Sequence, residues 1–213
     1  YLTSIYQKVF LGDIIARNTI SNSFALRVMF YKIAESVGRP LSFNRIANIV
    51  TATGAKVTTN TIINYIEYAK DAWLLLSIQN IEGKLVNKET NPKYYFLDNG
   101  LLNLFLLDGN TALLENLVAV NLIRKYGRED AVFYYHKNHE VDFYVPEASL
   151  AIQVCYKLDS SLNTYNREVD SLIKITKVLD CKKLVIVTKD QEQTLEVDGR
   201  TIEVIPIWRW LTA

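Results

Sequence analysis

Three strand candidates follow one another between residues 131 and 157 with no helical segment between them, and this order restricts the fold more than any other feature of the sequence. Their sequences are AVFYYH, EVDFYV and LAIQVCY, rich in residues that favour strands. Apolar periodicity predicts further elements around them: helices at 113–125 and 163–178, strands at 183–188 and 201–207, and a short terminal helix at WRWL. We therefore expect an α/β (mixed α+β) fold with a mixed sheet.

The preceding part of the chain has mainly helical patterning. Residues 23–37 carry apolar residues at helical spacing, Ser42 is in position to cap a second helix, and a third helix opens near Thr58 or Thr59. The apolar face of the third helix would comprise Ile62, Ile66, Ala69 and Trp73. Two β-rich runs, WLLLSIQN and KYYFLDN, follow with a polar loop between them. Three helices and such a hairpin predict a winged helix-turn-helix at residues 21–98.

Composition limits the classes of function. Lys and Arg total 24 against 23 Asp and Glu, so the chain lacks the strong positive field of a nucleic-acid coat protein or membrane binder, and any nucleic-acid contact must be local. Cys155 and Cys181 lie in apolar strand-like segments, which indicates buried thiols in a reducing compartment, the cytoplasm. The longest apolar stretches are too short to span a bilayer, and we expect no membrane partner.

The start of the chain suggests a piece of a longer protein. The first residue is Tyr1, the only methionine is Met29, and the first residues have the pattern of the middle of a helix. We expect residues 1–20 to form a connecting helix. The chain contains no G-x-x-x-x-G-K-[ST] motif, so it cannot by itself hold the phosphates of a nucleotide in a P-loop.

The residues that could carry chemistry lie on two strand candidates. Because side chains alternate along a strand, Glu140 and Asp142 should share one face, and Gln153, Cys155 and Lys157 should share a face of the next strand. Phosphodiester hydrolysis requires hard oxygen ligands for Mg²⁺ and a cation near the scissile phosphate. An amide and a thiol supply neither an anion nor a cation. The simpler alternative is a pair of solvated or ion-paired acids.

Nucleic-acid contacts in a winged helix would come from the third helix. The candidates are its leading polar residues, Thr58, Thr59, Asn60, Thr61 and Asn64. This helix has no arginine, and its lysines are offset by nearby acids, whereas a helix that reads a DNA groove usually has more positive charge. Docking of a protein, or packing of a domain, is therefore an equal alternative for this unit.

Several segments resemble one known family. ENLVAVNLIRK at 115–125, HEVDF at 139–143 and IQV at 152–154 resemble the PD-(D/E)xK nuclease-like module of a bacterial and archaeal family, in which an AAA-type ATPase module precedes a C-terminal domain of unknown function. YLTSIYQKVFLGDIIAR resembles the segment just after the ATPase, and KYYFLDNGLL resembles the motif between the winged helix and the nuclease-like part. The resemblance implies a restriction-endonuclease-like domain at residues 99–213.

The resemblance also implies roles by position. Glu115 would be the helix acid and Asp142 the central ligand, which makes these two the candidate Mg²⁺ ligands. Gln153 stands at the place of the second acid, and Cys155 stands at the place of the catalytic lysine. Glu140 and Lys157 are the candidate substitutes. The run Asn166-Arg167-Glu168, early in the predicted helix 163–178, could also approach this site.

From these observations we expect the C-terminal region of an AAA-type ATPase, acting as a DNA- or partner-binding module with a nuclease-like fold that does not cut. ATP would bind in a module outside this chain. The alternatives are a Mg²⁺-dependent deoxyribonuclease and a scaffold for oligomerisation or protein docking.

Overall fold

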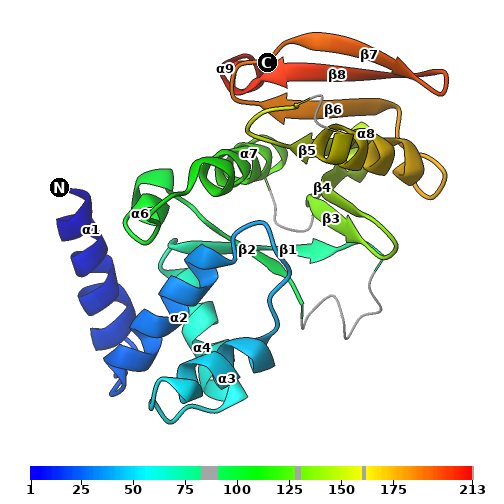
Figure 1. The fold of residues 1–213 in the computed structure, drawn as a ribbon. Coiled ribbons are helices and arrows are strands. Elements are labelled where there is room, and N and C mark those ends of the chain that lie inside the picture. The colour runs from blue at the N-terminus through cyan, green and yellow to red at the C-terminus, as the bar shows by residue number, and fades with distance from the viewer. Residues whose placement is uncertain (83–90, 128–130, 160–161, 213) are drawn as a thin grey trace. The chain divides into compact units, whose positions relative to one another are not determined.

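The computed structural model describes residues 1–82, 91–127, 131–159 and 162–212 (Figure 1). These residues form two compact units. The first unit comprises Tyr1–Ser77 and the described part of Leu85–Gly109, and the second comprises the described parts of Ile78–Lys84 and Asn110–Ala213. The domain limits expected from the sequence, at 1–20, 21–98 and 99–213, stay predictions.

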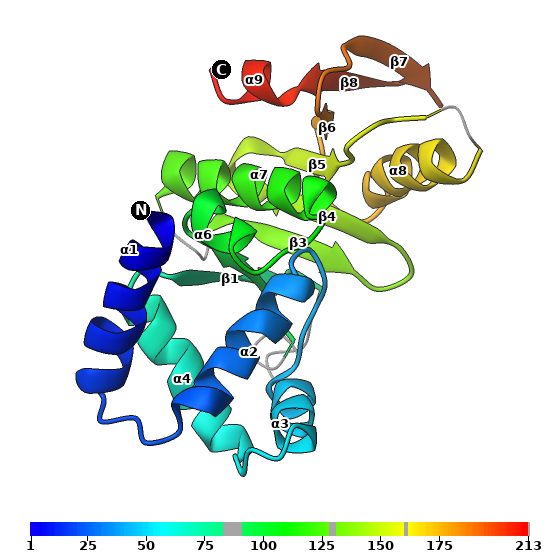
Figure 2. The same cartoon turned by 60° about the vertical axis from the view of Figure 1, so that its left-hand side comes forward.

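The first unit is mainly helical. Its elements, in chain order, are α1 (Leu2–Lys8), the π-helix η1 (Val9–Ala16), α2 (Ser23–Glu35), α3 (Phe43–Ala52), α4 (Thr59–Asp71), the start of β1 (Leu75–Asn80), β2 (Lys93–Phe96) and α6 (Asn99–Asn103). Figure 2 shows α2, α3 and α4 grouped together, and α3 packs against both of the others. The three predicted helices and the two predicted β-rich segments are therefore confirmed as elements.

Side-chain caps explain where the three central helices begin. Ser42 Oγ accepts a hydrogen bond from the backbone N–H of Arg45 at 3.2 Å, and Thr58 Oγ1 accepts one from the N–H of Thr61 at 3.1 Å. Asn22 caps α2 in the same way. Each cap satisfies one of the backbone donors that a helix leaves free at its first turn, which typically contributes about 1 kcal/mol.

An aromatic cluster in the first unit packs around Phe105. The ring centroid of Phe105 lies 5.3 Å from that of Tyr6, 5.1 Å from that of Tyr31 and 5.4 Å from that of Phe96. Phe30 is fully buried beside them. Such tilted and edge-on ring pairs stabilise a core beyond the burial of their apolar area.

The second unit is built on a sheet with helices packed against it. Its elements are the end of β1, α7 (Asn110–Tyr126), β3 (Phe133–His136), β4 (Glu140–Val145), η3 (Pro146–Ala148), β5 (Leu150–Val154), α8 (Leu162–Ile175), β6 (Lys183–Thr188), β7 (Gln193–Val197), β8 (Arg200–Pro206) and α9 (Ile207–Trp210). α7 packs on β5, and α8 packs on β4 and β5 (Figures 1 and 2).

The sheet is mixed, with eight strands in the order β2-β1-β3-β4-β5-β6-β8-β7. β3, β4 and β5 are antiparallel neighbours, as expected for strands joined by short connections. β5, β6 and β8 are parallel, and β7 closes the edge antiparallel to β8. The mixed α/β class predicted from the sequence is confirmed.

Some expectations about individual residues were wrong. β5 ends at Val154, so Cys155 and Lys157 lie beyond the strand, and the parity rule does not apply to them. Trp73 was expected on the buried face of the third helix but is 79% exposed. The reason is that α4 ends at Asp71 and Trp73 adopts a left-handed backbone with φ of 55°, which removes it from the helical period.

None of the helices within the described ranges is long and apolar enough to cross a membrane.

Candidate functional site

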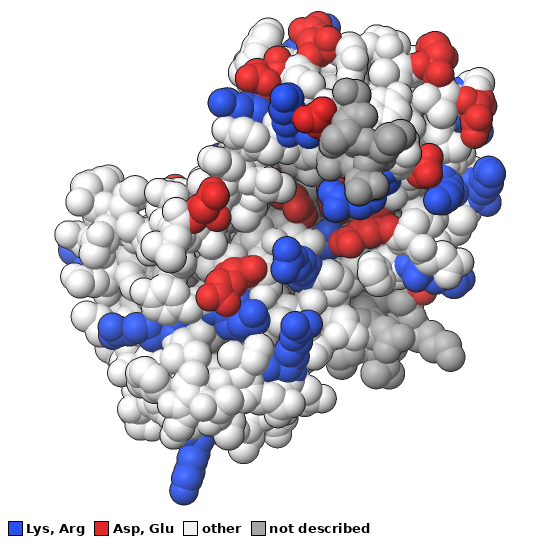
Figure 3. All heavy atoms as spheres, in the orientation of Figure 1, with Lys and Arg blue, Asp and Glu red and all other residues white. Residues whose placement is uncertain are grey.

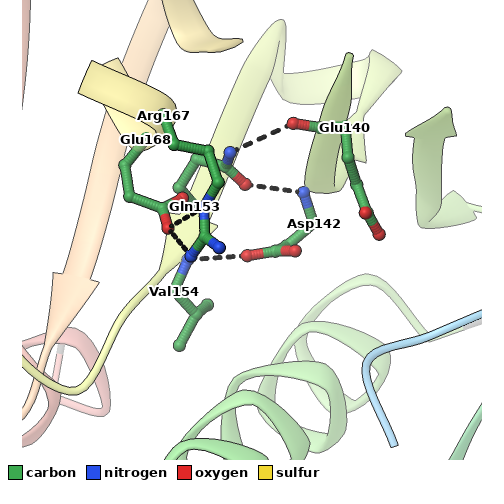
Figure 4. A network of polar contacts seen from close by, with 6 residues as sticks. All are labelled: Glu140, Asp142, Gln153, Val154, Arg167 and Glu168. Carbon is green, nitrogen blue, oxygen red and sulfur yellow. Dashed lines mark hydrogen bonds and ion pairs between the residues drawn. The ribbon is translucent and has the colours of Figure 1, made fainter. Parts of the chain in front are cut away.

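The candidate site lies where β4 and β5 stop pairing through their backbones. The last backbone pair in this direction is Phe143 with Ile152, so Asp142 and Gln153 would form the next one. Side chains replace the ladder there (Figure 4). Gln153 Oε1 accepts the backbone N–H of Asp142 at 2.9 Å, and Gln153 Nε2 donates to the carbonyl of Glu140 at 3.1 Å. The amide of Gln153 therefore joins two positions of β4.

Asp142 makes the reciprocal contact. Its Oδ2 accepts a hydrogen bond from the backbone N–H of Val154 at 2.9 Å. One amide and one carboxylate thus satisfy three backbone groups at the end of the two strands. Gln153 is buried, with 3% of its surface exposed, and a buried backbone group without a partner costs about 1–3 kcal/mol. This arrangement explains the amide at residue 153 in structural terms, because a carboxylate there could accept from Asp142 but could not donate to Glu140.

Helix α8 brings a second carboxyl to the same place. Glu168 is only 3% exposed, and its Oε1 accepts hydrogen bonds from Nε and Nη2 of Arg167 at 3.1 and 2.5 Å. Burial, followed by the negative charge of Asp142, raises the pKa of Glu168 to about 7, although the hydrogen bond and the charge of Arg167 lower it. Arg167 itself is largely exposed. Glu168 therefore changes its charge near neutral pH, a property that often marks functional sites.

Cys155 lies in this cluster as a neutral thiol. It is 4% exposed, and burial, followed by the charges of Glu168 and Asp142, raises its pKa to about 12. A thiol in this environment supplies neither a cation nor a thiolate at neutral pH. Its packing among apolar side chains of the second core is that of a small hydrophobic residue.

The remaining residues expected at the site are Lys157, Glu140 and Glu115. Lys157 is exposed, with its Nζ 3.8 Å from Asp159, and Oε2 of Glu140 lies 3.8 Å from Nδ1 of His136. Glu115 is buried in α7, the helix that packs on β5. Hydrogen bonds and electrostatic contacts bring together Asp142, Gln153 and Cys155, and Glu140 joins them through its backbone carbonyl. Of the run 166–168, the structure adds Arg167 and Glu168, which the sequence suggested only by their position early in a helix.

A model of one protein family matches residues 1–127, a domain of unknown function named DUF8612. The chain belongs to this family. The DUF8612 match covers α1 to α7, so it includes Glu115 and ends before β3 and Asp142. Most of the candidate site therefore lies outside the part that defines the family.

Two curated relatives of this DUF8612 chain are uncharacterised proteins. One, from Methanocaldococcus jannaschii, is 31% identical over 95% of this chain and 47% of its own length. The other, from Haemophilus influenzae, is 32% identical over 99% of this chain and 51% of its own length. The chain therefore spans about half the length of the curated relatives it matches. No solved structure matches it.

The donor set of the DUF8612 chain does not fit the Mg²⁺ site of a nuclease. Within the described ranges, no group of three or more His, Cys, Asp and Glu side chains could hold a metal ion. Mg²⁺ prefers carboxylate oxygens in near-octahedral geometry, whereas the oxygen of Gln153 is neutral and already bonded, and one oxygen of Asp142 is bonded to the backbone.

The residues expected to bind DNA divide into two groups. Thr58 caps α4 and contacts Thr61, while Oγ1 of Thr59 donates to Oδ1 of Asn44 at 2.7 Å. These three threonines serve the helix start and its attachment to α3. Asn60 and Asn64 are exposed one turn apart on α4 and are open to a partner.

Proposed function

We propose that this chain is a DNA- or partner-binding region of a larger ATPase, made of a winged helix and a nuclease-like domain that does not cut. The proposal rests on the structural roles of Gln153 and Cys155, the two residues that differ from the nuclease pattern. The amide of Gln153 replaces a stretch of backbone pairing, and the buried thiol of Cys155 is neutral. Both residues therefore have structural roles where a nuclease needs an anion and a cation.

One observation favours the alternative, a Mg²⁺-dependent deoxyribonuclease. Arg167 and Glu168 bring a cation and a second carboxyl close enough to feel the charge of Asp142. We prefer the binding function because Arg167 is hydrogen-bonded to Glu168, so each charge offsets the other. The pair supplies neither a free anion for a metal nor a free cation for a phosphate.

A cleavage assay separates these two functions. The chain is incubated with plasmid and branched DNA in Mg²⁺ or Mn²⁺, next to Asp142→Ala and to Asp190→Ala, which removes an exposed carboxylate elsewhere in the second unit. We expect no metal-dependent cleavage by any of the three proteins. Cleavage that requires the metal and is lost only in Asp142→Ala would show that the site is a nuclease.

The ATPase part of the proposal concerns the protein beyond this chain. Its support is the resemblance of the chain to the region that follows an AAA-type module, together with relatives of about twice its length. We expect the full-length protein to hydrolyse ATP and this chain alone to have no such activity. An ATPase assay on both proteins tests this, and a full-length protein without ATP hydrolysis would contradict it.

A further inference from the structure

Positive charge is concentrated in one segment of the first unit. Residues 36–66, which include α3 and the first half of α4, contain Arg39, Arg45 and Lys56 but no Asp or Glu. The whole chain has a net charge of +1, so this segment alone exceeds the total. The nearest acid along α4 is Glu67, which lies 3.8 Å from Lys70.

These three cations are exposed. In the described part of the chain, none of them forms an ion pair. Other exposed cations do have acidic partners, as in the contacts of Lys137 with Glu82 and of Arg209 with Glu192. In Figure 3 the bottom of the view, where Figure 1 shows α3, has cationic and neutral side chains, and carboxylates lie elsewhere on this face.

Exposed carboxamides lie on the same two helices. Asn48 is exposed on α3, and Asn60 and Asn64 are exposed on α4. The hydrogen bond from Thr59 to Asn44 fixes the first turn of α4 to the first turn of α3. Arg45 follows Asn44 directly in the chain, and Lys56 precedes Thr59 by three residues. We use the name α3–α4 face for Arg45, Asn48, Lys56, Asn60 and Asn64.

We propose that the α3–α4 face binds the phosphate backbone of double-stranded DNA. Arg45 and Lys56 would contact phosphates, and the carboxamides would hydrogen-bond to phosphates or to base edges, since an amide both donates and accepts. Exposed residues between 43 and 66 include no aromatic side chain, whereas surfaces that bind single strands stack bases on aromatic rings. The chemistry of this face therefore favours a duplex.

The proposal rests on the binding function above and makes it specific. Two phosphate contacts release about two counterions, which gives a slope of about −1.8 for log affinity against log salt concentration. Affinity should therefore fall roughly 12-fold between 50 and 200 mM KCl. Removal of both cations should weaken binding by more than about tenfold at 100 mM KCl and flatten the salt dependence.

Fluorescence anisotropy with a labelled 20-base-pair duplex tests this. The proteins are the wild type, the double variant Arg45→Ala/Lys56→Ala, and the control Lys8→Ala/Lys177→Ala, which removes two exposed cations elsewhere and changes the net charge equally. Circular dichroism verifies that each variant is folded. We expect the control to bind like the wild type and the α3–α4 variant to show the loss described above.

Four outcomes would overturn the proposal in distinguishable ways. A wild type without salt-dependent DNA binding would remove the DNA-binding function as well as the face. A double variant that binds like the control would leave that function standing but assign it to another surface. Equal or tighter binding of a single strand would exclude a duplex ligand. Competition by polyglutamate as strong as that by DNA would indicate an acidic protein partner.

Discussion

The amide of Gln153 provides the sharpest prediction, because its removal affects two backbone groups at once. Gln153→Ala leaves the N–H of Asp142 and the carbonyl of Glu140 without the partners that the amide supplies, inside a strand end that is largely closed to water. Each unsatisfied buried group costs about 1–3 kcal/mol. For two groups, we expect a total loss of about 2–6 kcal/mol in the free energy of unfolding of the second unit.

The measurement is urea unfolding of the wild type, Gln153→Ala and the control Gln193→Ala. Gln193 is an exposed residue of the edge strand β7, so its truncation should change the free energy of unfolding by less than about 0.5 kcal/mol. If Gln153→Ala were as stable as the control, the two hydrogen bonds of the amide to β4 would not stabilise the second unit. The structural reason for an amide at this position would then be wrong.

The remaining predictions concern a carboxyl, a thiol and a helix cap. The pKa of Glu168 is raised from 4.5 to about 7, so the folded protein holds this proton more tightly than the unfolded chain, and the free energy of unfolding should fall by on the order of 3 kcal/mol as pH rises from about 4.5 to 8. Chemical unfolding across this pH range should show a smaller fall for Glu168→Gln than for the wild type. The control Asp170→Asn, on the exposed face of α8, should behave like the wild type. Because burial raises the pKa of Cys155 to about 12, this thiol should resist thiol reagents at pH 8 in the folded protein and react only on unfolding. Rapid labelling of Cys155 in the native protein, located by mass spectrometry, would contradict this. Thr58→Ala should lower the melting temperature, because the loss of the α4 cap costs about 1 kcal/mol. The control Thr51→Ala, at an exposed position of α3, should not lower it. Equal melting temperatures of the two variants would contradict the role of Thr58 as a cap.

The fold could be predicted from the sequence where the pattern was local. Ser42 and the apolar spacing of α2 to α4 specified three helices, because capping and helical periodicity depend on neighbouring residues. β7 was missed because three of its five residues are exposed and its polar and apolar residues alternate over only four positions. A usable signal was present in Asp198-Gly199, whose backbones both have positive φ and form the turn between β7 and β8.

The candidate site could be predicted only in part. Strand alternation correctly placed Glu140 and Asp142 on one face of β4, where both are half-buried and the residue between them, Val141, is buried. Strand alternation failed at Cys155 and Lys157 because β5 ends at Val154, before both residues. Nothing in the sequence indicates that side chains replace the backbone pairing of β4 and β5 at that point. Glu168 depends on how α8 packs against β4 and β5, a long-range property that local patterns do not encode.

Our proposal that the described residues of the second unit hold no catalytic metal ion is tested most directly by calorimetric titration with Mn²⁺. Wild type and Asp142→Ala are titrated at pH 8, where Glu168 is mostly ionised and the site is at its most negative. We expect both proteins to give the same weak heats, without saturation in the millimolar range. One Mn²⁺ ion bound per chain in the wild type, and lost in Asp142→Ala, would contradict this proposal.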